Sequence, residues 1–169
     1  MQPLQVPPQI LVPQARSVHY AGFWRRFVAH VIDQIIVCIA AFVVFIPGLA
    51  LLGVGIGAGI MEESESAIGL ILAAIAAYLV AVMLIVIGQW LYYALMESSS
   101  KQATLGKLAL GIVVTDLSGN RITFGRATGR YFGKIVSGMI MCIGYIMAGF
   151  TEKKQALHDI MASCLVVLK

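Results

Sequence analysis

The sequence predicts an all-α membrane protein: a small helical transmembrane bundle with a short cytoplasmic β-hairpin or strand cap. Three observations predict this class. The composition is 60% hydrophobic and only 12% charged, whereas soluble domains usually carry about 25% charged residues. Two apolar stretches are long enough to cross a bilayer, which requires about 20 residues. Short strand-like segments lie outside these stretches, towards the middle and at the end of the chain.

The first apolar stretch runs from Phe27 to Ile60 and contains a single acid, Asp33. It is too long for one straight span, and Pro47-Gly48 is a typical place for a helix to break. We therefore place the first transmembrane span near residues 24–47. The glycine-rich sequence that follows would form a helix extension or a loop.

The second span is predicted near residues 67–96 and ends in aromatic residues typical of a membrane interface, namely Trp90, Tyr92 and Tyr93. No lysine or arginine lies between Arg26 and Lys101, and basic residues are frequent from there to Lys134. The positive-inside rule therefore predicts that the N-terminus and residues 97–134 are cytoplasmic. The acidic turn at residues 61–66 would lie outside.

Beyond the second span, the sequence IVVTD-LSGN-RITF is typical of a small hairpin, with a helix beginning at Gly125. The C-terminal CLVV could pair with GIVV or with RITF. Residues 135–150 form a short apolar segment with two interpretations. It either crosses the membrane or dips in and returns, and we favour the second because it keeps the C-terminus cytoplasmic.

Residues 1–19 are polar and rich in proline, so we expect a disordered tail that precedes a transmembrane domain over residues 20–169. The tail lacks the apolar segment of a cleaved signal peptide. The three cysteines lie in apolar sequence without a CxxC pattern, so we expect reduced, buried thiols at Cys38, Cys142 and Cys164.

The charged residues of the first span are the main candidates for function. Asp33 follows Arg26 by seven residues, nearly two helical turns, so both lie on one face roughly 10 Å apart along the axis, with His30 between them. A charge deep in a bilayer costs at least about 2.5 kcal/mol. A partner or protonation must offset this cost. The acid therefore either binds a proton, cation or ligand, or fixes helix packing through a partner.

Two other groups of residues are candidates. His158 and Asp159 form a second His/acid pair near apolar sequence, but together with His30 and Asp33 they match no metal-site spacing, so no metal site is expected. A basic stripe at helical spacing consists of Arg126, Arg130 and Lys134. We favour a stripe that faces lipid headgroups. Alternatively, one of these cations neutralises an acid within the membrane.

Several function classes are excluded or unsupported. The net charge of +4 comes from basic residues at the ends of apolar segments, not from a continuous basic face, so nucleic-acid binding is not expected. No GxSxG, HExxH or similar motif is present. We therefore expect neither an enzyme nor a bound cofactor.

The segment GFWRRFVAHVID resembles the opening signature of RDD-family membrane proteins, which are named for one arginine and two aspartates. The segments TLGKLALGIVVTDLSGNRITFGRATGRYFGK and KKQALHDIMASCLVV are similar to the rest of that domain, so the resemblance extends from Tyr20 to Leu168. By position, the resemblance assigns the arginine to Arg26, the first aspartate to Asp33 and the second to Asp159.

The resemblance implies a part in transport of small ions, with cations exchanged for protons, in a bacterial-type plasma (inner) membrane. We hypothesise that Arg26, Asp33 and Asp159 form one charge network, with His30 and His158 beside it. Two spans are too thin to enclose a path, so transport would need a homo-oligomer, with close helix contacts at Gly53, Gly57 and Gly69. The alternative is a non-catalytic assembly or scaffold module in which the network is structural. Headgroup handling by the basic stripe is a third hypothesis.

Overall fold

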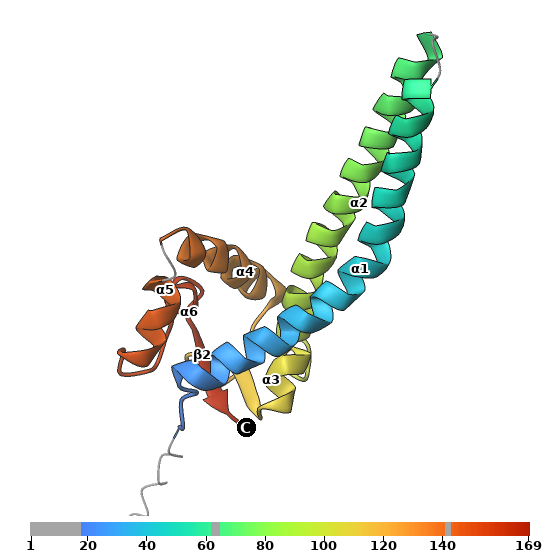
Figure 1. Ribbon diagram of the computed structural model, residues 1–169. Helices are drawn as coiled ribbons and strands as arrows, with labels where there is room; N and C mark the ends of the chain where they lie inside the picture. Colours follow the sequence, from blue (N-terminus) through green and yellow to red (C-terminus); the bar gives the residue numbers. More distant parts are fainter. Residues whose placement is uncertain (1–17, 62–64, 141–142) are drawn as a thin grey trace, which may run out of the picture.

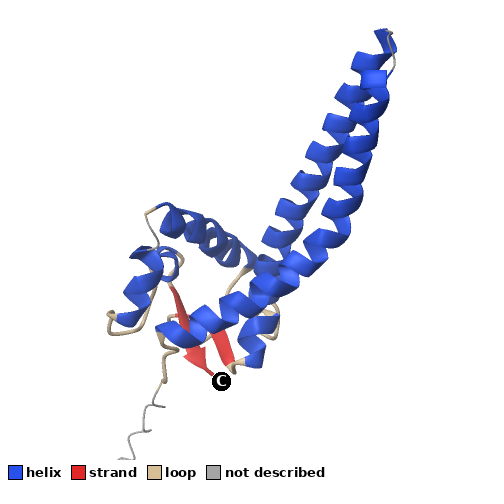
Figure 2. Cartoon of the chain, viewed as in Figure 1, coloured by secondary structure: helices blue, strands red, loops and turns tan. Residues whose placement is uncertain are grey.

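The computed structural model describes residues 18–61, 65–140 and 143–169. Two long helices, α1 (Phe23–Met61) and α2 (Glu65–Ser98), run side by side away from a smaller base (Figures 1 and 2). The base contains α3 (Leu105–Ala109), β1 (Ile112–Asp116), α4 (Phe124–Met139), α5 (Ile143–Ile146), the 3-10 helix η1 (Met147–Gly149), α6 (Leu157–Met161) and β2 (Cys164–Leu168). The predicted class, a helical membrane protein with a small strand cap, is confirmed. Most of the predicted tail, half of the acidic turn and Cys142 lie outside the described residues.

Both long helices are apolar and long enough to cross a membrane. At 1.5 Å per residue α1 measures about 58 Å, roughly twice the thickness of the hydrocarbon layer. All charged side chains of α1 lie in its first part, between Arg25 and Asp33. The uncharged remainder of α1 is therefore the part suited to cross a membrane, and we expect its charged start at the membrane edge.

Helix α1 continues through Pro47 to Met61, so the helix break predicted at Pro47-Gly48 does not occur and the glycine-rich sequence is a helix extension. A proline removes one backbone hydrogen bond, but hydrocarbon offers no water to replace the others, so the helix persists. The close contact between the two long helices occurs at Gly55, where a Cβ atom would lie 2.5 Å from the Cβ of Ala74. The predicted contact glycines, Gly53, Gly57 and Gly69, face open space in the single chain.

The two strands form an antiparallel sheet in which Ile112 lies opposite Leu168 and Asp116 opposite Cys164. The predicted pairing of the C-terminal strand with GIVV is therefore confirmed. Tyr20, just ahead of α1, adds a bridge to Val167. A small apolar core beneath the sheet includes the fully buried side chains of Val114, Val166 and Ala21.

The predicted hairpin strand at residues 121–124 does not form. The chain does turn after β1, where the Asp116 carboxylate accepts hydrogen bonds from the backbone N–H of Ser118 (2.9 Å) and Asn120 (2.8 Å). It then enters α4, whose N-cap Thr123 accepts from the N–H of Arg126 at 3.3 Å. The partner of β1 is β2, so the turn leads into a helix instead of a second strand.

Helix α4 and the segment Ile143–Gly149 meet at an angle of 117°, so residues 135–150 do not form one straight span within the described part of the chain. Strand β2 pairs with β1, which follows closely after the end of α2. The C-terminus, the sheet and Tyr20 therefore share one end of the molecule (Figure 1). This arrangement agrees with N- and C-termini on the same side of the membrane.

The two cysteines within the described residues are both free thiols. Cys164 is buried beside the sheet, as expected. Cys38 is exposed on α1, so the prediction of a buried thiol is wrong there. The reason is that α2 covers only one face of α1, and the described residues leave Cys38 uncovered on another face.

Candidate functional site

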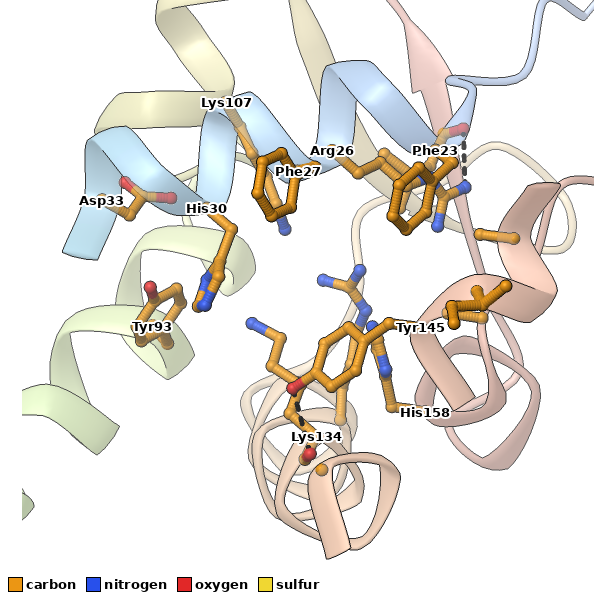
Figure 3. A pocket seen from close by; sticks show the side chains of 16 residues that line it. Phe23, Arg26, Phe27, His30, Asp33, Tyr93, Lys107, Lys134, Tyr145 and His158 are labelled. Atoms are coloured by element: carbon orange, nitrogen blue, oxygen red, sulfur yellow. Dashed lines mark hydrogen bonds between the residues drawn. The ribbon is translucent and has the colours of Figure 1, made fainter. Parts of the chain in front are cut away.

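A cavity of about 520 Å³ lies where the start of α1 meets the end of α2, α4, α5 and α6. Figure 3 shows side chains from these elements around one space, with Arg26 and His30 entering from α1 and Lys134 from α4. The cavity has charged residues on several sides and apolar residues between them. Its charged and polar lining consists of Arg26, His30, Asp33, Tyr93, Lys107, Arg130, Lys134, Tyr145 and His158.

Arg26 and Asp159 form an ion pair, as the sequence predicted, although 133 residues separate them. The Nε of Arg26 also donates to the carbonyl oxygen of Ala21 at 2.9 Å. Asp159 is fully buried on α6, where it accepts from the N–H of Ala156 at 3.1 Å and from Arg130 at 2.7 Å. This ion pair ties the start of α1 to the C-terminal region.

Arg130 joins this pair to a second buried acid, Glu97. Its Nη1 lies 2.7 Å from Glu97 Oε2, and its Nη2 lies 2.7 Å from Asp159 Oδ1. Lys107 contacts Glu97 Oε1 at 2.6 Å, and Lys134 lies 3.6 Å from the same oxygen. Glu97 and Arg130 are almost completely buried. Two acids and four cations from α1, α2, α3, α4 and α6 thus form one continuous charge cluster.

Asp33 is outside this charge cluster, so the hypothesis of one network with Arg26 and Asp159 is wrong for this residue. Its carboxylate accepts from the Tyr92 hydroxyl (2.8 Å), the Gly106 N–H (2.7 Å) and the Thr104 hydroxyl. No ion pair joins it to a cation among the described residues. Three uncharged donors from α2 and the start of α3 therefore satisfy this acid.

The close approach of α3 to α1 depends on Gly106. A Cβ atom at this position would lie 2.1 Å from the carbonyl oxygen of Ala29 and 2.9 Å from Cγ of Asp33. Glycine has no Cβ, so its backbone N–H can reach the carboxylate directly. The sequence TLGK thus builds the Asp33 site from one hydroxyl and one backbone donor.

The basic stripe does not face lipid headgroups as a whole. Arg130 is 2% exposed and pairs with two acids, so the predicted headgroup-facing position is wrong for it. Lys134 is also largely covered, and its ammonium lies 4.1 Å from the centre of the Tyr93 ring. Only Arg126 is exposed. Side chains four positions apart on a helix differ by about 40° in direction around the helix axis. Along the stripe this rotation accumulates, so Arg126 faces outward while Arg130 and Lys134 face inward.

The two histidines line the cavity at separate places. His158 lies between Tyr145, whose ring centroid is 5.1 Å away, and Ser137, whose hydroxyl is 3.4 Å from Nδ1. His30 lies near Tyr93 (Figure 3). The histidines and aspartates do not gather around one point, and no group of three metal-ligating side chains forms within the described residues.

Burial and neighbouring charges shift the pKa values of three side chains near the cavity. Burial lowers the pKa of His158 to about 3, so this ring is neutral at physiological pH. Burial also lowers the pKa of Lys107 to about 7, helped by Arg130 and opposed by Glu97. Burial alone would raise the pKa of Asp159, but the charges of Arg130 and Arg26 outweigh it and hold that pKa well below its usual range.

Sequence reasoning missed two members of the charge cluster, Glu97 and Lys107, and it also missed Tyr93, whose ring lies beneath the ammonium group of Lys134. Glu97 is the acid that ends the charge-free second span, and Lys107 stands between the leucines of TLGKLAL. A lone charge flanked by apolar residues is a signal of burial with a partner. The sequence alone does not identify the partner, since Glu97 meets Arg130 from a helix 33 residues further along.

The RDD family model matches residues 20–163 of this chain. An uncharacterized protein of Bacillus subtilis (strain 168), YxaI, is 39% identical over 151 residues, which covers 88% of this chain and 97% of that protein. The uncharacterized membrane protein YteJ of the same organism is 29% identical over 154 residues, covering 88% of this chain and 80% of YteJ. No solved structure gives a significant match. With the Arg26–Asp159 pair in place at the base of two apolar helices, this membrane protein belongs to the RDD family.

Proposed function

We propose that this protein binds a small anionic group in the cavity at the base of its two long helices. The observation that carries this proposal is the charge balance of the cluster. Four cations surround two acids, and each acid already accepts from at least two cations. The Asp33 carboxylate also lines the cavity and is held by uncharged donors, so the cations outnumber the acids by one. An entering cation would meet repulsion, whereas an entering anion would meet unneutralised positive charge. The role is binding and not catalysis.

The position of the cavity supports binding at a membrane edge. The cavity lies against the charged start of α1, where Trp24 is 73% exposed, as is typical of side chains at a membrane interface. The excess of basic residues at this end favours a cytoplasmic location under the positive-inside rule. The relatives from Bacillus subtilis support a bacterial plasma membrane.

Thermal unfolding of the purified full-length protein in detergent tests this proposal. We expect millimolar inorganic phosphate to raise the melting temperature in a saturable way at constant ionic strength, because a ligand of the folded state stabilises it. Sodium and potassium gluconate should give no such rise. If the cations stabilise the protein and phosphate does not, the proposal is wrong.

Lys134→Gln and Arg126→Gln form a matched pair for this experiment. Both remove one positive charge from α4, but Lys134 lines the cavity and Arg126 is exposed outside it. We expect Lys134→Gln to abolish most of the phosphate effect and Arg126→Gln to preserve it. Equal losses in both variants would indicate a non-specific charge effect.

Cation–proton exchange by a homo-oligomer is the second candidate function. Its support is the fully buried carboxylate of Asp33, which lines the same cavity as His30. Cation flux in proteoliposomes that stops with Asp33→Asn, in a protein that still folds, would favour this function. Equal flux with and without Asp33 would exclude it. If neither binding nor flux is found, the charge cluster serves only to hold a membrane scaffold together.

A further inference from the structure

We infer that the anion is the phosphate of a membrane lipid whose headgroup carries a net negative charge, and that it enters the cavity from the surrounding leaflet. This inference rests on the proposed function and names the ligand class of the same site. Lys134 would contact the phosphate, and the start of the acyl chains would lie along Phe27 and Ile146. Three features of the cavity lead to this ligand.

The first feature is the ammonium group of Lys134, whose ion pair with Glu97 is long and which makes no hydrogen bond among the described residues. Glu97 Oε1 is 3.6 Å away and already accepts from Lys107 at 2.6 Å. The ammonium instead lies over the Tyr93 ring, and its side chain is only 14% exposed. Covering a charged donor without an acceptor is unfavourable. A phosphate oxygen in the cavity would supply the missing acceptor.

The second feature is the set of nitrogen donors opposite Lys134, namely the cations Arg26 and Lys107 and the imidazole of His30. Arg26 and His30 enter the same space from α1, and Lys107 enters it from α3 (Figure 3). Charge from two sides suits a compact tetrahedral anion, which offers oxygens in several directions. A carboxylate or phosphate would fit this chemistry, and phosphate is the anionic group common to bilayer headgroups.

The third feature is the apolar rim of the cavity. Phe27 and Ile146 line it and are 48% and 47% exposed, respectively. Nearby on α4 and after η1, Met139 is 79% exposed and Phe150 is 86% exposed. A freely soluble anion gains nothing from such a rim, whereas an acyl chain buries it. The volume of about 520 Å³ is within the range of small-molecule sites and admits a headgroup.

The test measures binding to the purified full-length protein by native mass spectrometry and thermal unfolding in a neutral detergent. The probes are dioleoyl phosphatidylglycerol, dioleoyl phosphatidylcholine, glycerol 3-phosphate and inorganic phosphate. We expect phosphatidylglycerol to bind about ten-fold more tightly than glycerol 3-phosphate, because the acyl chains bury the rim. Phosphatidylcholine should not compete with it, since its headgroup carries a compensating cation.

Separate variants test the contact with the phosphate and the contact with the acyl chains. Lys134→Gln should weaken phosphatidylglycerol binding about ten-fold, the usual scale of a lost charged hydrogen bond. Arg126→Gln is the matched charge control and should leave it unchanged. Phe27→Ser, at an exposed position, should weaken the lipid several-fold and leave inorganic phosphate unaffected.

The outcomes separate this inference from the function on which it rests. If phosphate binds but phosphatidylglycerol binds no more tightly than glycerol 3-phosphate, the inference of a lipid ligand is wrong, whereas the proposal of anion binding is retained. If no anion binds, both are wrong. Lipid binding that is unchanged in both Lys134→Gln and Phe27→Ser would place the lipid elsewhere and overturn the inference. Should Lys134→Gln not fold, the Phe27→Ser result decides alone.

Discussion

Arg130 donates to Glu97 and to Asp159, each at 2.7 Å, and so connects α2 to α6 through its own helix α4. Both acids are buried, and each also has a second cation partner, Lys107 or Arg26. Removing one member of a buried ion pair usually costs about 3–5 kcal/mol, because the other charge remains uncompensated. The cluster therefore fixes which helices meet at the base, whatever ligand the cavity takes.

Gly106→Ala tests the packing of α3 against α1. The added Cβ would lie 2.1 Å from the Ala29 carbonyl oxygen, so α3 must move away and the N–H donor to Asp33 is lost. We expect a loss of about 1–3 kcal/mol in the free energy of unfolding, measured by thermal unfolding in detergent. Gly129→Ala on α4 is the control, since no atom lies within 4 Å of its Cβ position. Equal stability of both variants would contradict the proposed contact.

The pH dependence of stability tests the burial of His158. Its pKa is about 3 in the folded protein, against an ordinary value of 6.5. Between these values the unfolded chain binds a proton that the folded protein does not. Stability is therefore lost as the pH falls from 6.5 towards 3, by up to about 1.4 kcal/mol per pH unit.

His158→Gln should remove this contribution, so its melting temperature should fall less steeply than that of the wild type between pH 6.5 and pH 4. The measurement is thermal unfolding in detergent over a series of buffers. Asp159 contributes below this window, because its lowered pKa keeps its ion pairs intact until the pH falls further. Parallel pH profiles of variant and wild type would show that His158 is not the responsible group.

At the scale of elements, the strand pair β1–β2 closes the base beneath α1. The Ala21 N–H donates to the Val166 carbonyl oxygen at 2.9 Å, and the Leu168 N–H donates to His19 at 2.9 Å. The segment before α1 thus lies along the outer edge of β2. A two-stranded sheet is marginal by itself, so its stability depends on the helices and on this added segment.

Val166→Thr and Val167→Thr compare the two faces of β2. Val166 is fully buried against the core, whereas Val167 is only partly buried. A hydroxyl in the core costs about 1–3 kcal/mol. We therefore expect Val166→Thr to lower the melting temperature in detergent clearly and Val167→Thr to change it little. A larger effect at Val167 would mean that the strand faces the other way.

At the scale of the whole molecule, the end of α1 at Met61 and the start of α2 at Glu65 lie far from the base (Figure 1). Two spans joined in this way return the chain to the side on which it started. We therefore expect the sheet, the charge cluster and the C-terminus on one side of the membrane and Met61 on the other. The charge asymmetry makes the cytoplasm the expected side of the base.

Cysteine labelling tests this topology. Lys101→Cys and Lys154→Cys introduce exposed thiols at the base, and Met61→Cys, at a position 89% exposed, introduces one at the far end. The native cysteines are replaced by serine beforehand. In intact cells, a membrane-impermeant maleimide should label Met61→Cys alone, and in inside-out vesicles it should label the other two. Opposite labelling of positions 101 and 154 would show that residues 135–150 cross the membrane.

The sequence by itself determined the two apolar spans, the strand cap and, through the family resemblance, the pair Arg26–Asp159. It left GIVV and RITF open as partners of CLVV. Hydropathy and charge can be read from the local sequence, and they decide directly which segments are stable in a bilayer. The sequence also indicated that Asp33 must have partners, because a buried charge requires compensation.

Only the tertiary structure decided which partners these are. Asp33 bonds to Tyr92, Thr104 and Gly106 instead of joining Arg26. Arg130, expected at the surface, is buried between two acids. Such choices depend on which helix faces meet, and that is fixed by contacts between residues far apart in the chain, such as the missing Cβ of Gly106 against Ala29. The local sequence shows that a buried charged residue needs a partner, and the packing of the helices determines which residue that partner is.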